Sequence, residues 1–308
     1  MKEFATLAAT QREAILADLA LRLNMPAFIV EKDFWVCWLL GRIFAVPSLG
    51  AECVFKGGTS LSKVFGVIQR FSEDVDLSIS PASLGWRESE LNEAPSVSMR
   101  QKRMKKVEAG CAVAVSDRFM PELETEIGRL LGPRQADSGW LVYELDPASH
   151  SPVLWFRYPA AVASGAYIAP MVKMEFGSLT DQRPTGKHKI CALLEPAAPG
   201  VFADTGAEVV ALELERTFWE KATILHAEYH RPSEKQIPAR FARHYADFAA
   251  LWRHPAGAIA ARRLDLLECV RPHKSRFFTS AWASYDTAVP GTLRLMPREQ
   301  RVAELRRD

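Results

Sequence analysis

The sequence of 308 residues is poor in cysteine and shows none of the usual cysteine spacings. An odd number of scattered thiols without any C-x-x-C pair argues against both a disulfide framework and a common zinc site. We therefore expect reduced, buried thiols and a cytoplasmic protein. The five cysteines are Cys37, Cys53, Cys111, Cys191 and Cys269.

A long hydrophobic run and a strong net charge are also missing. No apolar stretch is long enough to cross a bilayer, and residues 1–23 have the charges of an amphipathic helix rather than a signal peptide. We expect no membrane partner. Since 39 basic side chains face 37 acidic ones, a net formal charge of +2, any site for a polyanion must come from local clustering.

What is present is the composition of an ordinary folded protein, 48% hydrophobic and 25% charged. The length allows two modest domains. A proline- and glycine-rich stretch, 195–206, predicts a junction between a mixed α/β domain (1–200) and a helical domain (201–308). Helices are expected at 3–23, 30–45, 60–67 and, as two long polar helices, across 87–131; strands are expected at 53–55, 74–80, 140–145, 153–158, 168–176 and 187–194.

Two aspartates stand two positions apart in the predicted strand 74–80. Because alternate residues of a strand share a face, Asp74 and Asp76 should project together while Val75 and Leu77 enter a core. Neighbouring carboxylates repel each other unless a cation lies between them, and Mg²⁺ binds through one or two carboxylates plus substrate phosphates. The alternative is that an isolated D-x-D is only a solvated strand end.

A glycine pair, Gly57 and Gly58, precedes this strand and opens a predicted helix. Glycine lets the backbone approach a ligand closely, so that N–H groups hold phosphate oxygens. A lone glycine pair is usually a turn. Followed by the aspartates, however, it matches the general pattern of polymerase-β-like nucleotidyltransferases, which need phosphate and metal binding.

A third carboxylate, Glu175, is the only acid in the predicted strand 168–176, where it shares a face with Lys173. A carboxylate from a neighbouring strand supplies the third ligand of a two-metal site. A surface Lys–Glu pair on an edge strand is the alternative, and the sequence leaves both open.

Two further candidates lie on helices of the C-terminal half. Lys221 either neutralises a triphosphate as a point charge or is simply solvated. Asp247, between apolar neighbours, is either partly buried with a partner or paired with Arg243 four residues earlier.

A helical histidine pair, His226 and His230, has the spacing of a zinc site. The zincin pattern needs glutamate directly after the first histidine, and this sequence has Ala227. We therefore do not expect zinc there.

Six segments of the sequence occur in a characteristic order. Together they resemble the AbiEii family, the nucleotidyltransferase toxins of AbiE-type toxin–antitoxin and phage-defence systems. The segments are EKDFWVCWLL (31–40), FKGGTSLSKVFG (55–66), RFSEDVDLSI (70–79), VKMEFG (172–177), FWEK (218–221) and ARHYADF (242–248).

The resemblance implies an α/β (α+β) bilobed protein, with a mixed sheet in a polymerase-β-like nucleotidyltransferase core and a C-terminal helical domain. It implies transfer of a nucleotide from an NTP, with Mg²⁺ or Mn²⁺, to an acceptor that in several relatives is the 3′ end of tRNA. A cognate antitoxin is an expected partner, without a stable complex being required.

The resemblance also assigns roles to residues. Asp74 and Asp76 would bind metal and be catalytic, with Glu175 as the third acid. Lys221 would contact the nucleotide, and Asp247 would be required in the active site. The candidates for binding nucleotide phosphates are Gly57, Gly58, Thr59, Ser60, Lys63 and Ser72.

Two other functions stay open: nucleotidylation of a protein hydroxyl, or a nucleotide- or RNA-binding module without catalysis. The basic run 100–106 is a candidate guide for an RNA acceptor, and a solvated helix face is the alternative. Its basic residues are Arg100, Lys102, Arg103, Lys105 and Lys106. Beyond about residue 255 no motif is recognised.

Overall fold

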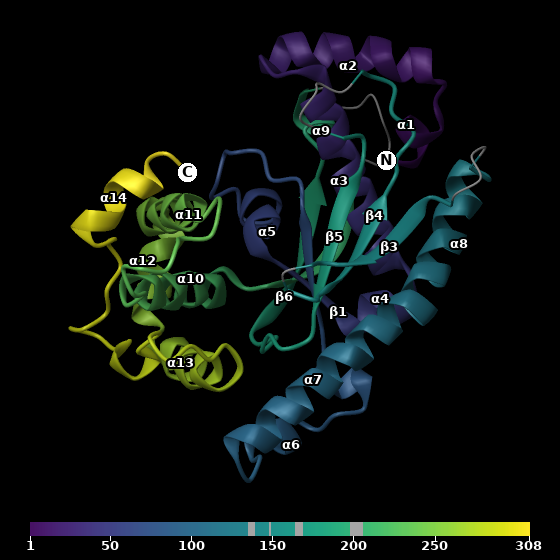
Figure 1. Ribbon diagram of the computed structural model, residues 1–308. Helices are drawn as coiled ribbons and strands as arrows, with labels where there is room; N and C mark the ends of the chain where they lie inside the picture. The colour runs from purple at the N-terminus through teal and green to yellow at the C-terminus, as the bar shows by residue number, and fades with distance from the viewer. Residues whose placement is uncertain (135–138, 148, 164–168, 198–205) are drawn as a thin grey trace. The chain divides into compact units, whose positions relative to one another are not determined.

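The computed structural model describes residues 1–134, 139–147, 149–163, 169–197 and 206–308. The chain divides into two compact units. The first comprises Met1–Val64 and Arg70–Ala211, and the second comprises Phe65–Gln69 and Leu212–Asp308. The first unit contains a sheet with helices around it, and the second is helical (Figure 1).

Within the described residues, seven strands form one mixed sheet in the order β3-β4-β5-β2-β1-β7-β6. β2 runs parallel to β5 and β1 parallel to β7, whereas β1–β2, β3–β4 and β4–β5 are antiparallel. The mixed sheet and α/β class expected from the sequence are confirmed. The strands are β1 (Cys53–Lys56), β2 (Val75–Ile79), β3 (Leu141–Leu145), β4 (Pro152–Phe156), β5 (Val172–Gly177), β6 (Thr185–Cys191) and β7 (Gly206–Leu212).

The two central strands alternate between buried and accessible side chains. In β2, Val75 and Leu77 are fully buried while Asp76 between them is half-buried. In β5, the apolar residues are buried and Lys173 and Glu175 are half-buried. The period-2 prediction is therefore confirmed for β5 and for Val75–Leu77 of β2, whereas Ser78, next along β2, is buried as well. β5 begins only at Val172, and residue 168 of its predicted span lies outside the described residues.

The N-terminal region contains α1 (Lys2–Thr6), α2 (Ala9–Leu23) and α3 (Ala27–Ala45). A continuous helix over 3–23 was wrong, because Leu7 and Ala8 are extended. The buried Arg12 guanidinium donates to the carbonyl of Leu7 at 2.9 Å and to that of Ala5 at 3.3 Å, which satisfies carbonyls near the break. Asn24, in the left-handed region at φ 50°, ends α2.

Helix α3 provides much of the core of the first unit. Most of its side chains are buried all round, as expected for a helix enclosed by other elements. Trp38 stacks on Phe156 of β4, and Trp35 stacks on Tyr158, each with ring centroids 5.6 Å apart. The helix is thereby fixed against β4, the neighbour of the strand β5 that carries Glu175.

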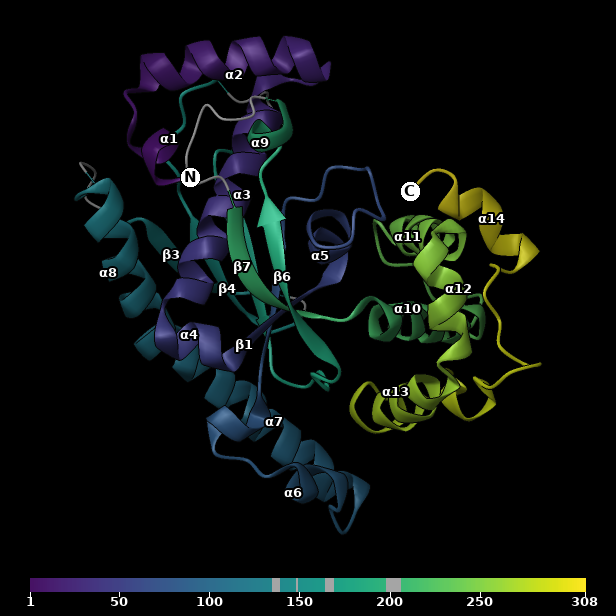
Figure 2. The ribbon, with the colours of Figure 1, turned by 180° about the vertical axis from the view of Figure 1, so that it is seen from behind.

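A long helical rod runs beside the sheet (Figures 1 and 2). It consists of α7 (Val97–Ala114) and α8 (Met120–Leu131), joined by a π-helical segment, Val115–Phe119. Pro121 lacks the N–H that a regular helix would need there, which favours the wider turn. The other short helices of this unit are α4 (Pro47–Glu52), α5 (Gly57–Lys63), the 3₁₀ turn Pro81–Leu84, α6 (Glu88–Asn92) and α9 (Leu194–Ala197).

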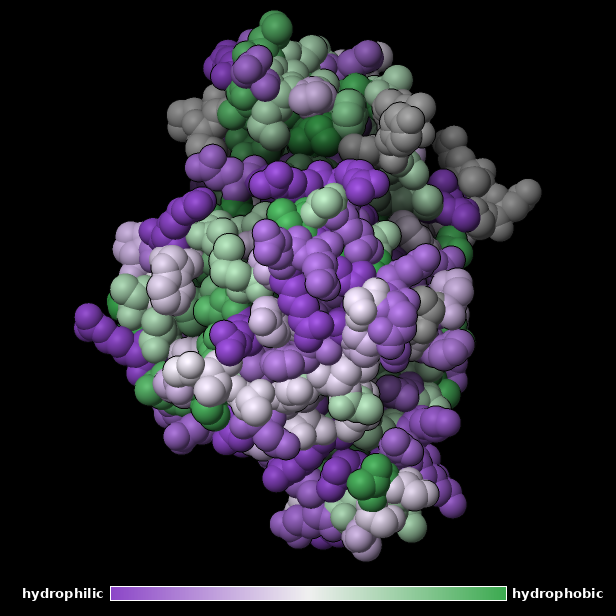
Figure 3. Space-filling view, turned by 60° about the vertical axis from the view of Figure 1, so that its left-hand side comes forward, coloured by the Kyte–Doolittle hydropathy of each residue, from purple (hydrophilic) through white to green (hydrophobic). Residues whose placement is uncertain are grey.

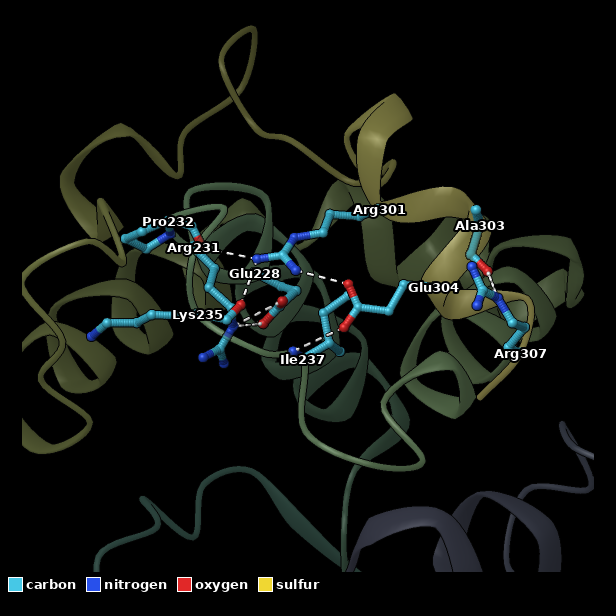
Figure 4. Close-up of polar contacts among 9 residues, drawn as sticks. All are labelled: Glu228, Arg231, Pro232, Lys235, Ile237, Arg301, Ala303, Glu304 and Arg307. Atoms are coloured by element: carbon cyan, nitrogen blue, oxygen red, sulfur yellow. Dashed lines mark hydrogen bonds and ion pairs between the residues drawn. The ribbon is translucent and has the colours of Figure 1, made fainter.

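In the second unit, the C-terminal helix is fastened to the loop that follows α10. Arg301 donates to the carbonyls of Pro232 and Lys235 at 2.8 and 2.5 Å, and Glu304 accepts from the N–H of Ile237 (Figure 4). The helices are α10 (Leu214–Tyr229), α11 (Ala242–Arg253), α12 (Pro255–Arg262), α13 (Leu264–Phe277), the 3₁₀ turn Tyr285–Thr287 and α14 (Glu299–Leu305).

The surface agrees with the composition. Hydrophilic residues predominate on the face that Figure 3 presents, with smaller hydrophobic groups between them. Among the helices of the described residues, none has the length and apolar character needed to span a membrane.

Candidate active site

The D-x-D pair lies at the centre of the sheet. Asp76 pairs in register with Lys56 of β1 on one side and with Glu175 of β5 on the other, and Asp74 stands just before β2. Burial raises the pKa of Asp74, and the nearby carboxylates of Glu73, Asp76 and Glu175 raise it further. The fold thus concentrates negative charge at the N-terminal end of β2.

Gly57 is required by its contact with this carboxylate pair. Its φ is +83°, and a Cβ built on it would lie 1.9 Å from Oδ2 of Asp76. The close approach expected of the glycine turn is therefore made to the aspartate. At Gly58, a Cβ would lie 2.9 Å from Nη2 of Arg70 and 3.2 Å from Oγ of Ser72.

The hydroxyl groups of α5 point inward and tie the glycine turn to β2. Thr59 Oγ1 donates to the backbone carbonyl of Asp74 and lies 2.9 Å from Ser72 Oγ. Ser60 Oγ donates to the carbonyl of Gly57 at 2.9 Å. Since the side chains of Thr59 and Ser60 are buried, what this turn offers to a ligand outside is its backbone.

The predicted third acid, Glu175, is close to Asp74 and Asp76 but is already paired with a lysine side chain. Glu175 accepts a hydrogen bond from Lys173, whose Nζ lies 3.9 Å from Asp146 and over the ring of Trp155. In the part of the chain that the structure describes, no three His, Cys, Asp or Glu side chains are grouped closely enough to hold a metal ion. The group that fits a divalent cation is therefore the carboxylate pair, with substrate phosphates completing the shell.

Three consecutive charged residues of α3, Glu31, Lys32 and Asp33, support the site, and the sequence reasoning gave them no role. All three are buried. The carboxylate of Glu31 accepts from the N–H groups of Ala161 and Val162 at 2.7 and 3.1 Å. This fixes the segment that follows β4.

Lys32 and Asp33 reach the two candidate motifs. Lys32 pairs with Glu73, the residue directly before Asp74. Asp33 pairs with Lys63 at the end of α5 and accepts from the N–H of Leu193 at 2.8 Å. The available signal was a charged triplet in a helix whose other residues, apart from Arg42, are uncharged, because buried charges need partners.

The second unit contains its own polar cluster. Lys221 Nζ, on α10, lies 3.0 Å from Oδ2 of Asp247 and 3.1 Å from Nδ1 of His244, both on α11. Lys221 and Asp247 are 8% and 1% exposed, so the pair is buried. Asp247 is therefore buried with a partner, as one of the two alternatives predicted, and the partner is Lys221 rather than Arg243. His244 also belongs to this cluster and was not predicted from the sequence.

The basic run of α7 is divided in the structure. Lys102, Lys105 and Lys106 are exposed. Arg103 donates to the backbone carbonyl of Glu90 and is half-buried. Three lysines therefore remain accessible to an anionic partner.

The family of the chain is shown by comparison with known proteins. Residues 38–308 match the family described as the nucleotidyl transferase AbiEii toxin of type IV toxin–antitoxin systems. The chain belongs to the AbiEii family. This AbiEii protein is therefore a nucleotidyltransferase toxin, which confirms the enzyme class expected from the sequence. Family membership implies an NTP substrate, an antitoxin partner and, as is typical of such enzymes, a divalent metal.

Among solved structures, the AbiEii chain is similar to MenT4, a nucleotidyltransferase toxin from Mycobacterium tuberculosis H37Rv. The two share 14% sequence identity and a TM-score of 0.37, over 96% of this chain and 97% of that one. A comparison with curated proteins gives no match.

Proposed function

We propose that this AbiEii toxin transfers a nucleotide from an NTP to the 3′ end of tRNA in the cytoplasm, in a reaction that depends on Mg²⁺. The observation that carries the catalytic part is the pairing of Asp76 with Glu175 across β2 and β5, with Asp74 and the Gly57 turn beside it. The tRNA acceptor is carried by the resemblance of the six ordered segments.

In this proposal Asp74 and Asp76 hold Mg²⁺, or Mn²⁺ in its place, and Glu175 is the third candidate ligand. The bound metal would make the acceptor hydroxyl more acidic and neutralise the departing pyrophosphate. Lys173, paired with Glu175, holds that carboxylate in place. The repulsion that raises the pKa of Asp74 is the expected property of a site built for a cation.

The resemblance assigns contacts with the nucleotide to residues of each unit. Lys221 neutralises the triphosphate, and Asp247 fixes the orientation of the ammonium group, which its 3.0 Å contact supports. The candidates for binding the phosphates are the backbone of Gly57, Gly58, Thr59 and Ser60, together with Lys63 and Ser72, and the exposed lysines of α7 guide the acceptor strand.

A partition experiment tests the reaction. The protein is incubated with labelled NTP, Mg²⁺, total RNA and total protein, and the label in each fraction is counted. We expect label in RNA, loss of that label in Asp74→Ala, and retention in Asp18→Ala, a control on an exposed aspartate of α2 that pairs with Arg22. Circular dichroism shows whether both variants are folded.

Two outcomes would contradict the proposal. Label confined to the protein fraction would favour nucleotidylation of a protein hydroxyl. Full activity in folded Asp74→Ala would remove this residue from the catalytic site.

A further inference from the structure

The charges of the chain are unevenly distributed between its two parts. Residues 212–308 contain 17 Lys and Arg against 12 Asp and Glu, an excess of five positive charges. Residues 1–211 contain 22 against 25, an excess of three negative charges. The nearly neutral total therefore hides a basic C-terminal unit.

Part of this excess gathers around one aromatic ring. The guanidinium groups of Arg294 and Arg298 lie 5.5 and 5.1 Å from the centroid of Tyr229, the last residue of α10. Arg294 is exposed, and Arg298 and Tyr229 are half-buried. With the adjacent His230, these residues form what we call the Tyr229 cluster.

The two arginines of the cluster keep their charge available. Within the described residues, no ion pair joins Arg294 or Arg298 to a carboxylate, whereas Arg301 nearby in sequence is bound to Glu304. Burial, with Arg298 and Arg294 beside it, lowers the pKa of His230, as expected where positive potential is concentrated.

A second cation–aromatic contact follows directly along the chain. The guanidinium of Arg231 lies 4.5 Å from the centroid of the Trp282 ring. Figure 4 shows that the same guanidinium is held by Glu228, at 2.7 Å. Because its charge is compensated, Arg231 serves to fix the chain beside Tyr229 and leaves Arg294 and Arg298 as the uncompensated pair.

This arrangement has the chemistry of a site for a nucleic-acid backbone. A guanidinium resting on an aromatic ring has lost much of its freedom but keeps N–H donors that match phosphate oxygens. Interleaved arginine and aromatic side chains on a basic surface are the footprint of RNA binding. None of these residues belongs to the six family segments.

We propose that the Tyr229 cluster binds the phosphate backbone of the RNA acceptor. This inference rests on the proposed RNA acceptor and adds the surface of the second unit that recognises it. Arg294 and Arg298 each contact a phosphate, and Tyr229 holds the two side chains in position.

The test measures binding of fluorescein-labelled bulk tRNA to the full chain by anisotropy, over a series of salt concentrations. In Arg294→Glu/Arg298→Glu, we expect affinity at 0.1 M salt to fall by about tenfold or more. We also expect the slope of log K against log salt to become shallower by roughly 1.5, because two phosphate contacts are lost. Tyr229→Leu keeps both charges and should lose only about two- to fivefold.

The matched control is Arg253→Glu/Arg262→Glu, which changes the net charge equally at two exposed arginines of the same unit. An unchanged affinity and slope in the Arg294/Arg298 variant, or an equal loss in the control, would overturn the inference. Transfer of nucleotide to tRNA that is unaffected by the Arg294/Arg298 variant would overturn it while leaving the proposed function intact. If the Arg294/Arg298 variant lost tRNA binding but the label were found only on protein, the Tyr229 cluster would still be a binding surface for tRNA. The RNA acceptor of the proposed function would then be refuted.

Discussion

At the scale of single residues, Gly57 matters because it has no Cβ atom. Gly57 combines a φ of +83° with a position where any Cβ would overlap the Asp76 carboxylate. Gly85 has nearly the same φ, +81°, but nothing lies within 4 Å of the Cβ built there. Comparing the two glycines therefore separates the effect of backbone strain from the effect of contact with the Asp76 carboxylate.

We predict that Gly85→Ala lowers the free energy of unfolding by about 1–2 kcal/mol, the strain of a left-handed backbone, and keeps nucleotidyl transfer. Gly57→Ala should destabilise more and lose most of the transfer activity, because Asp76 must move. Urea unfolding and initial rates measure both effects. Equal activity in the two folded variants would show that the contact with Asp76 has no role in catalysis.

Asp33 and Lys63 form a buried ion pair, with side chains 2% and 10% exposed. Removing one partner leaves an uncompensated buried charge, so Asp33→Asn or Lys63→Met alone should cost about 3–5 kcal/mol of stability. The double variant should cost clearly less than the sum, as urea titration of all four proteins would show. Additive losses would mean that the pair does not act as a unit.

The same double variant tests the proposed role of Lys63 in nucleotide binding. Because both charges are absent, the variant is expected to fold, and a rise in KM for the NTP then reports a direct contact. An unchanged KM would confine Lys63 to holding α5 against α3.

At the scale of elements, one histidine joins α10 to the C-terminal segment. His226 Nδ1 accepts from the N–H of Arg294 at 3.0 Å, and Nε2 lies 3.0 Å from the carbonyl of Ser284. This pattern fits the neutral ring with its proton on Nε2, since a proton on Nδ1 would face another donor. Burial accordingly lowers the pKa of His226.

The sign of the resulting pH dependence follows from linkage. An unfolded histidine takes up a proton near pH 6.5, whereas the folded one resists it, so stability is full above about pH 6.5 and falls as the pH is lowered. We predict that unfolding free energy drops by up to about 1 kcal/mol more in the wild type than in His226→Asn between pH 7 and 5.5. Parallel pH profiles for the two proteins would contradict this.

At the scale of the whole molecule, features that depend on short-range patterns could be predicted from the sequence. The alternation in β2 and β5 identified Asp76 and Glu175 as accessible positions, because burial of the neighbouring apolar residues depends on local period alone. The order of six segments identified the family. The helical part was predicted from residue 201, but strand β7 occupies Gly206–Leu212 and the first helix after it begins at Leu214.

Contacts between residues that are far apart in the sequence could not be predicted. Glu31 and Asp33 accept hydrogen bonds from backbone N–H groups that lie 130 and 160 residues away, and no local pattern predicts these partners. The break at Leu7 depends on Arg12, whose guanidinium also binds the carbonyl of Pro159. Asp247 had a plausible partner four residues away, yet its observed partner, Lys221, is 26 residues distant.

The most direct test of the account is sequencing of tRNA 3′ ends after incubation with the purified toxin, Mg²⁺ and each NTP in turn. We expect added nucleotides at tRNA 3′ ends with the wild type and none with folded Asp76→Ala. Unextended 3′ ends with the wild type and every NTP, or equal extension by Asp76→Ala, would contradict the proposed reaction.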